Sequence, residues 1–328
     1  MLCCDWDGID ALVETIEQRL AAGQDAVHPF FWQAISDSPH SLLLAAQNHD
    51  RTRRVIAAAD RGFALPEPDS KIRVGYVSGE LNQSPNGMVM AGVFDHHDPT
   101  SFEIVAFDNG SDDRTALLQR IISAFDQVVD VRAMSDRDMA GAIREAGIDV
   151  LINLNGFFGN ARSEVFRHRP APVQVNYLGC PGTMGGFEMD YAIADATVVP
   201  DDERRFYTEA IVQLPDSYYP TDRERPIADR TFSRAECGLP EIGFVFCCFN
   251  TAHKILPATF ARWMHILNSV EGSVMWLLGS HSLATANLRA EATRHGIDPA
   301  RLVSAPAMPP DGHLARHRCA DLFLDTLP

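Results

Sequence analysis

The sequence lacks the features that mark several large classes of protein. No apolar run reaches the roughly 18 residues that a membrane-spanning helix needs, so we expect no membrane span. The first residues, MLCCDWD, give no sign of a secretory signal, because no basic stretch precedes an apolar one. Basic residues are scarce: 28 Lys and Arg stand against 44 Asp and Glu, a formal net charge of −16. Such a chain has no general attraction for nucleic acid, and a phosphate-bearing substrate would need a local cationic pocket.

Motifs for metals and for common catalytic centres are also missing. The seven cysteines are irregularly spaced and form no CxxC pair, which argues against a zinc site and indicates a reducing, cytosolic compartment. There is no Walker loop, no GxGxxG after a first strand, no Ser-His-Asp arrangement and no spacing typical of a metal triad. We therefore expect a cytoplasmic protein that needs no metal and no other bound cofactor.

The length and pattern of the chain predict two domains behind a short preamble. With 328 residues, 46% of them hydrophobic and 22% charged, the chain is globular in composition and too long for one ordinary core. Residues 1–70 are predicted to form a helical N-terminal region, since apolar residues recur there at helical spacing. The stretch 65–70, LPEPDS, breaks that pattern and is predicted to be a linker.

After residue 71 short apolar strands alternate with helices. This pattern predicts an α/β fold with parallel sheets in two Rossmann-like lobes, 71–215 and 232–328, joined by an irregular interlobe segment, 216–231. The second lobe ends directly after a strand, so we expect that lobe to be incomplete. The predicted strands are 72–77, 102–107, 148–154, 173–178, 244–249, 273–278, 302–304 and 321–324, and the predicted helices cover about 114–125, 136–146, 284–295 and 311–319, with one more beginning at Pro257.

Candidate site residues follow from the rule that ligands bind at the carboxyl ends of strands in open parallel sheets. In the first lobe the rule selects three loops, 78–87, 155–162 and 179–186, whose small residues let the backbone approach a ligand closely. Three such loops would face one crevice. Ordinary turn chemistry explains the same glycines, so that alternative stays open.

In the second lobe the rule selects the loop 250–254 and the helix start at 311–318. Lys254 could neutralise a diphosphate as a point charge, although a solvated surface lysine is the alternative. His313 could stack on a base, and Arg316 could contact a base or a phosphate, whereas the alternative is a solvated helix start.

Five segments in a fixed order resemble the catalytic region of the O-linked N-acetylglucosamine transferase family, including its SPINDLY-like members. They are RPAPVQVNYLGCPGTMG (169–185), MDYAIAD (189–195), CCFNTAHKILP (247–257), SVMWLL (273–278) and ARHRCADLFLDTLP (315–328). The resemblance runs from about residue 72 to 328. It implies a GT-B fold, with two Rossmann-like lobes and the active site in their cleft.

The resemblance also implies an activity. This is the metal-independent, inverting transfer of N-acetylglucosamine from UDP-N-acetylglucosamine to a Ser or Thr hydroxyl of an acceptor protein or peptide, although some relatives use GDP-fucose. It implies that Lys254 steadies the departing diphosphate. The other residues that it places at the donor site are Gly179, Pro181, Gly182 and Thr183 beside the sugar, Asn250 and Thr251, and His313 and Arg316 at the uridine.

Two departures from the family pattern keep other hypotheses open. Ser84 and Met88 stand where the family usually has histidines, and a serine hydroxyl is a poor general base near neutral pH. The family's His-Thr-Thr element, which holds the diphosphate, has no counterpart up to Pro328. The alternatives are a non-catalytic relative or fragment that acts as a binding module, and a GT-B enzyme that acts on small molecules or glycans. Neither the acceptor nor the oligomeric state is predicted.

Overall fold

The computed structural model describes residues 3–52, 63, 70–279 and 281–326. The chain divides into two compact units. The N unit is Thr15–Glu224, and the C unit combines Met1–Glu14 with Arg225–Pro328. The predicted linker falls almost wholly outside the described residues, and the predicted boundaries at residues 70, 215 and 231 stay predictions.

The N unit is built on a seven-stranded parallel sheet with the order β3-β2-β1-β4-β5-β6-β7. The strands β2 and β3 lie on one side of β1, and β4 to β7 lie on the other. The loops after β1 and β4 therefore diverge at a switch point. The strands are β1 (Ile72–Ser78), β2 (Phe102–Asp108), β3 (Gln127–Asp130), β4 (Val150–Asn153), β5 (Val173–Asn176), β6 (Tyr191–Asp195) and β7 (Ala210–Leu214).

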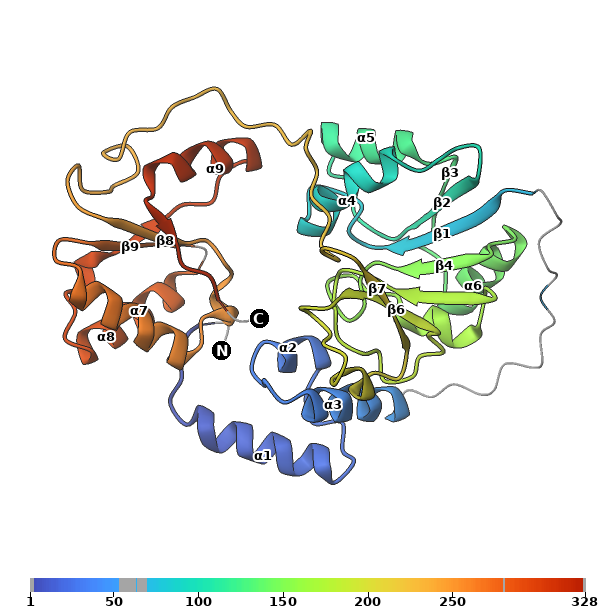
Figure 1. Ribbon diagram of the computed structural model, residues 1–328, viewed down its shortest axis with the longest axis horizontal. Coiled ribbons are helices and arrows are strands. Elements are labelled where there is room, and N and C mark those ends of the chain that lie inside the picture. Colours follow the sequence, from blue (N-terminus) through green and yellow to red (C-terminus); the bar gives the residue numbers. More distant parts are fainter. Residues whose placement is uncertain (1–2, 53–62, 64–69, 280, 327–328) are drawn as a thin grey trace. The chain divides into compact units, whose positions relative to one another are not determined.

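Helices cover both faces of this sheet, which explains its continuous apolar strands. Val74 and Tyr76 pack in one apolar cluster with residues of α4 and α5, whereas Val77 packs in another with residues of α6 and the 3₁₀ helix η1, as the alternation of a strand requires. Helices α4 and α5 lie on one side of β1, and α6 lies on the other (Figure 1). The helices of this unit and of the preamble are α1 (Ile9–Ala21), α2 (Pro29–Gln33), α3 (Pro39–Thr52), α4 (Pro85–Asp95), α5 (Ala116–Ala124), α6 (Asp136–Glu145), η1 (Ser163–His168) and η2 (Arg204–Phe206). The helical preamble is thus confirmed for the part of it that is described.

The C unit repeats the same principle with the order β10-β9-β8-β11, again parallel. Its switch point lies between β8 and β11. Cys247 and Cys248 are buried on opposite faces of β8, where each packs as a small hydrophobe. The elements are β8 (Val245–Cys248), η3 (Ala252–Lys254), α7 (Pro257–Ser269), β9 (Val274–Leu278), α8 (Ser282–Arg294), η4 (Pro299–Arg301), β10 (Leu302–Ala305), α9 (Pro310–Arg316), η5 (His317–Cys319) and β11 (Leu322–Phe323).

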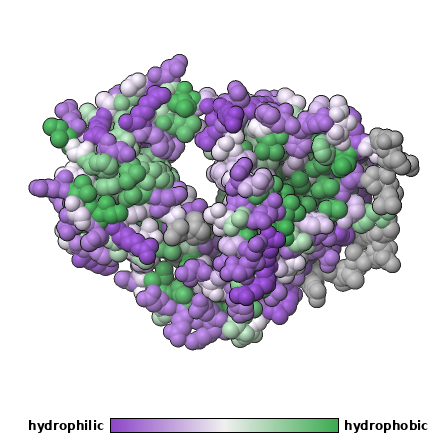
Figure 2. All heavy atoms as spheres, in the orientation of Figure 1, coloured by the Kyte–Doolittle hydropathy of each residue, from purple (hydrophilic) through white to green (hydrophobic). Residues whose placement is uncertain are grey.

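The surface is mixed. In Figure 2 apolar residues gather over the sheet regions of both units, and hydrophilic residues cover most of the rest of the visible face. The edge strand β11 contributes exposed apolar side chains, Leu322 and Phe323. Among the described residues no helix is both long and apolar enough to cross a membrane.

Candidate functional site

The switch point of the C unit joins two loops that are 75 residues apart in the sequence. Asn250 follows β8, and its side-chain amide donates to Asp325 Oδ1 at 2.6 Å and to Thr326 Oγ1 at 2.7 Å, both in the segment after β11. Because neighbouring strand ends diverge at this point, a parallel sheet forms its ligand site here. The predicted residues Asn250 and Thr251 therefore lie at the edge that the topology selects.

Lys254 lies on the single 3₁₀ turn η3, directly after this switch-point loop. It is half-buried, and it is one of only two lysines in the chain, the other being the exposed Lys71. Among the described residues no carboxylate forms an ion pair with Lys254. None of the described carboxylates therefore neutralises its ammonium group. This leaves the charge available for a phosphate.

His313 and Arg316 lie on α9 and pack against Phe249, the residue that follows β8. The rings of His313 and Phe249 are 4.9 Å apart, and the Arg316 guanidinium carbon lies 4.8 Å from the centre of the Phe249 ring. Arg316 is 1% exposed, and it donates to His313 Nδ1 at 2.6 Å and to the Pro306 carbonyl at 2.5 Å. Arg316 is therefore placed to orient His313, whereas the half-buried ring of His313 reaches the surface.

The contact with Arg316 also settles the tautomer of His313. A guanidinium can only donate, so Nδ1 must accept, and the neutral ring then carries its proton on Nε2. Burial, together with the nearby charge of Arg316, lowers the pKa of His313 to about 4. Burial also lowers the pKa of Arg316 below its ordinary value. At neutral pH His313 is an uncharged hydrogen-bond donor on an aromatic support.

In the N unit the three predicted loops meet at one edge of the sheet. The Gly79 amide, after β1, donates to Asn155 Oδ1 at 3.0 Å. The Gly179 amide, after β5, donates to the Leu154 carbonyl at 3.1 Å, and a Cβ on Gly179 would lie 2.4 Å from that oxygen. Glycine at 179 is therefore required by the close approach of two backbones.

The turn that contains Pro181, Gly182 and Thr183 is held by residues just before β7. Glu209 is 5% exposed and accepts from Thr183 Oγ1 at 2.7 Å and from the Met184 amide at 2.7 Å. Burial raises the pKa of Glu209, although these donors act in the opposite direction. The Tyr207 hydroxyl donates to the Pro181 carbonyl at 2.8 Å. The turn is thus fixed from beneath by a buried carboxyl group.

Ser84 is used for local structure. It is the N-cap of α4: its hydroxyl accepts from the Gly87 amide at 3.2 Å and donates to the Glu80 carbonyl at 2.8 Å. Met88 is half-buried one turn further along α4. Ser84 therefore serves as a helix cap, and its neutral hydroxyl is a poor general base for an incoming nucleophile near neutral pH.

Four residues of these edges are not among the individual site residues predicted from the sequence. Glu209, Tyr207, Phe249 and Asp325 each act through partners that are distant in sequence or are backbone atoms. Only Glu209, a lone acid before an apolar run, carries a hint of burial. Among the described residues no group of three or more His, Cys, Asp or Glu side chains could hold a metal ion.

Comparison with known proteins decides the family. The sequence profile of Glycosyl transferase family 41 matches residues 54–231 and 226–328, which contain every described strand of both sheets. The chain belongs to glycosyl transferase family 41. The family resemblance inferred from the sequence is confirmed.

Named relatives agree with this membership. The chain is 34% identical over 261 residues to a probable UDP-N-acetylglucosamine–peptide N-acetylglucosaminyltransferase SEC of Arabidopsis thaliana, covering 78% of this chain and 27% of the relative. It is 23% identical to the UDP-N-acetylglucosamine–peptide N-acetylglucosaminyltransferase of Caenorhabditis elegans, covering 99% of this chain and 39% of that one. The chain thus spans well under half the length of these relatives.

A solved structure gives the fold. A mutant O-GlcNAc transferase from Thermobaculum terrenum is similar with a TM-score of 0.81 and 28% identity, covering 98% of this chain and 62% of that one. The expected GT-B fold with its Rossmann-like sheets is confirmed by this likeness.

Proposed function

We propose that this protein transfers N-acetylglucosamine from UDP-N-acetylglucosamine to Ser or Thr hydroxyls of acceptor proteins. The observation that carries the proposal is the arrangement at the C-unit switch point. There the Asn250–Lys254 loop and the neutral His313 beside Phe249 lie at one end of the sheet, as a nucleoside diphosphate would require. The names of the relatives support the donor and the kind of acceptor.

In the proposed reaction the acceptor hydroxyl attacks the anomeric carbon of the sugar with inversion. The bond from that carbon to the diphosphate oxygen breaks, UDP leaves with the electron pair, and the hydroxyl proton is lost to a base. Lys254 would neutralise the charge that develops on the diphosphate, so that no metal ion is needed. The turn at Pro181–Thr183, fixed by Glu209, would border the sugar.

The two lysines of the chain provide a matched test. Lys254→Met should lower the rate of transfer of labelled N-acetylglucosamine to a Ser/Thr peptide by on the order of 10²–10³-fold, the usual loss when one group that stabilises developing charge is removed. Lys71→Met, at an exposed position, should leave the rate unchanged. The assay is made on the full-length product of the gene. Equal rates for the two variants would remove Lys254 from the mechanism.

A non-catalytic binding module is the second candidate, and the capping role of Ser84 favours it. The hydroxyl of Ser84 serves as a helix cap, and a hydroxyl is a poor general base near neutral pH, so Ser84 supplies no base. The two candidates differ in one result. A binding module takes up UDP-N-acetylglucosamine without turnover, and Ser84→His does not change that. A transferase turns the donor over with Ser84 in place and draws its base from elsewhere.

We also propose a cytoplasmic location. All seven cysteines are free thiols, and five of them are buried: Cys4, Cys180, Cys247, Cys248 and Cys319. Fractionation of cells that express a tagged full-length protein would test the location.

A further inference from the structure

Residues 3–6 belong to the same compact unit as Lys254, although about 250 residues separate them in the sequence. The Cys4 thiol donates to the Ala252 carbonyl at 3.4 Å. The Cys3 carbonyl accepts from Asn287 Nδ2, on α8, at 2.9 Å. The Trp6 ring lies 5.5 Å from the ring of Phe260 on α7. Three independent contacts therefore fasten this short segment across α7, α8 and η3.

The segment is part of the core of the C unit. Cys4 is 3% exposed and packs in one apolar cluster with Phe260 and Ile255, and Trp6 lies against the same cluster. The backbone of Cys4 has a φ of +51°, which is unfavourable for a residue with a side chain and persists where surrounding contacts fix it. Burial raises the pKa of Cys4 to about 11, so the thiol keeps the proton that it donates.

The contact falls on a very short element of the candidate site, the three-residue helix η3. η3 is a single 3₁₀ turn, whose backbone bonds are Lys254 N–H to the Thr251 carbonyl at 3.0 Å and Ile255 N–H to the Ala252 carbonyl at 3.1 Å. Short 3₁₀ turns have poor hydrogen-bond geometry and little stability of their own. The Ala252 carbonyl, which receives the Cys4 thiol, is therefore one of few fixed points close to Lys254.

We propose that residues 3–6 form a brace that holds the 252–254 turn in place and so positions Lys254 for a diphosphate. Cys4 and Trp6 are positioning residues in this account, because they contact the turn and its supporting helix. The next residue, Asp7, lies 3.9 Å from Arg294, but both side chains are largely exposed, so this ion pair adds little. The proposal rests on the proposed function only in naming the diphosphate.

The brace can be tested by acylating the lysines of the intact chain and quantifying each site by peptide mass spectrometry. Lys71 serves as the internal reference, since it is exposed and lies in the other unit. Cys4→Ala removes the hydrogen bond to the Ala252 carbonyl and should raise the acylation rate of Lys254 relative to Lys71 by about fivefold, the effect expected for the loss of about one net hydrogen bond. Trp6→Leu removes the ring contact with Phe260 and should raise the same ratio. Cys3→Ala should change nothing, because Cys3 takes part through its backbone carbonyl.

UDP is the probe for the diphosphate. In the unaltered chain UDP should protect Lys254 but not Lys71, and this protection should weaken in Trp6→Leu and Cys4→Ala. Uridine, which lacks phosphate, should give no protection in any variant. If Trp6→Leu fails to fold, Cys4→Ala still tests the brace.

The outcomes separate the two hypotheses. If UDP does not protect Lys254 in the unaltered chain, the diphosphate role of the proposed function is wrong, and the acylation rates alone decide the brace. If UDP protects Lys254 equally in all variants and the rates stay unchanged, the brace is wrong and the proposed function stands.

Discussion

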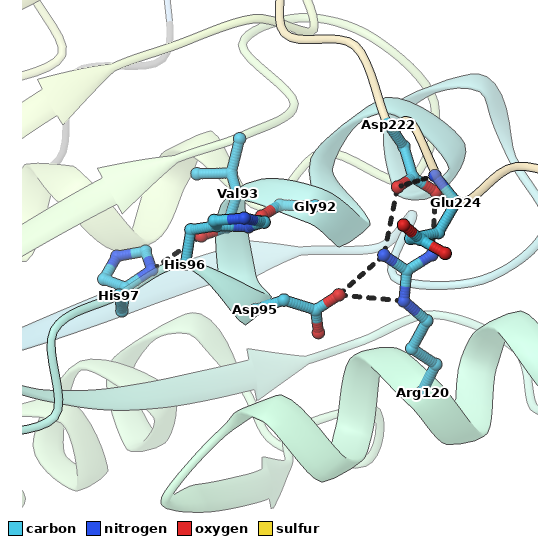
Figure 3. A network of polar contacts seen from close by, with 8 residues as sticks. All are labelled: Gly92, Val93, Asp95, His96, His97, Arg120, Asp222 and Glu224. Carbon is cyan, nitrogen blue, oxygen red and sulfur yellow. Dashed lines mark hydrogen bonds and ion pairs between the residues drawn. The ribbon is translucent and has the colours of Figure 1, made fainter.

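The ion pairs of Arg120 in the N unit allow a quantitative prediction for this arginine. Arg120, on α5, bonds Asp222 in a bidentate manner at 2.8 and 3.0 Å and reaches Asp95 at 2.6 Å (Figure 3). The Asp222 side chain is 1% exposed, and its Oδ1 also accepts from the Glu224 amide at 3.1 Å. Since the N unit ends at Glu224, Arg120 anchors the last segment of this unit to α4 and α5.

The magnitude follows from the burial of the carboxylate. Arg120→Met preserves much of the packing but leaves Asp222 buried without its cation. Breaking a buried pair by removing one partner typically costs about 3–5 kcal/mol. Here the arginine side chain is 26% exposed and the Glu224 amide remains as a donor, so we expect a loss of about 2–3 kcal/mol in the free energy of unfolding of the N unit.

The assay combines urea unfolding with amide hydrogen exchange. Exchange in the peptide that contains Asp222 localises the effect, since a chain of two units need not unfold in one step. Arg132→Met is the matched control: Arg132 bonds Asp130 at 2.5 Å, but both side chains are more than half exposed, so no change is expected. If both variants unfold at the same urea concentration and exchange near Asp222 is unchanged, burial of this pair does not stabilise the segment.

Three further predictions concern the candidate site. Glu209→Gln should lower the free energy of unfolding by about 1–3 kcal/mol, because either Thr183 Oγ1 or the Met184 amide loses its acceptor. In calorimetry the same variant should weaken binding of UDP-N-acetylglucosamine more than binding of UDP. His313 should stay neutral in an NMR titration down to about pH 4. An unfolded histidine takes up its proton near pH 6.5, so between pH 6.5 and about 4 the unfolded chain binds more protons than the folded chain. The free energy of unfolding should therefore fall as pH falls through this range. His313→Gln should remove that part of the pH dependence. Ser84→Ala should lower stability by about 1 kcal/mol through loss of the N-cap, and Ser84→Thr should retain most of it, as urea midpoints would measure.

The predicted strands were those with continuous apolar runs. β1, β2, β8 and β9 lie in the sheet interiors, and burial on both faces requires such runs. The sequence pattern predicts no strand at the positions of β3, β6 and β7. β3 and β7 are edge strands with many exposed residues, so their sequences lack a strong apolar pattern.

Helix α4 was also not anticipated, because its first residues are Pro85, Asn86 and Gly87, which read as a turn. Proline is favourable in a first helical turn, and Ser84 supplies the cap, so the same residues are a helix start. A Cβ at residue 87 would lie 2.0 Å from the Asn82 carbonyl oxygen, which explains why a glycine stands in this first turn. The same local residues therefore fit either a turn or a helix start, and the sequence pattern alone does not distinguish the two.

The rule that ligands bind at strand ends selected the loops of the candidate site. It did not tell which charged residue in those loops is available to bind a phosphate. From the sequence, Lys254 and Arg316 are two cations at strand ends in a chain that has few. The structure separates them by their bonds. Arg316 is buried and donates to His313 and to a carbonyl, whereas Lys254 is half-buried and has no carboxylate partner among the described residues.

A cation whose donors are already bonded to the protein must break those bonds to bind a phosphate, and a buried one must also lose its packing. Of these two residues, Lys254 is therefore the one that can respond to charge developing on a leaving diphosphate, and Arg316 acts through the tautomer and orientation of His313. The different roles of the two residues predict different binding results for their variants. Arg316→Lys cannot keep both bonds of the guanidinium, to His313 Nδ1 and to the Pro306 carbonyl, and should weaken uridine and UDP binding alike. Lys254→Met should weaken UDP binding and leave uridine binding as it was.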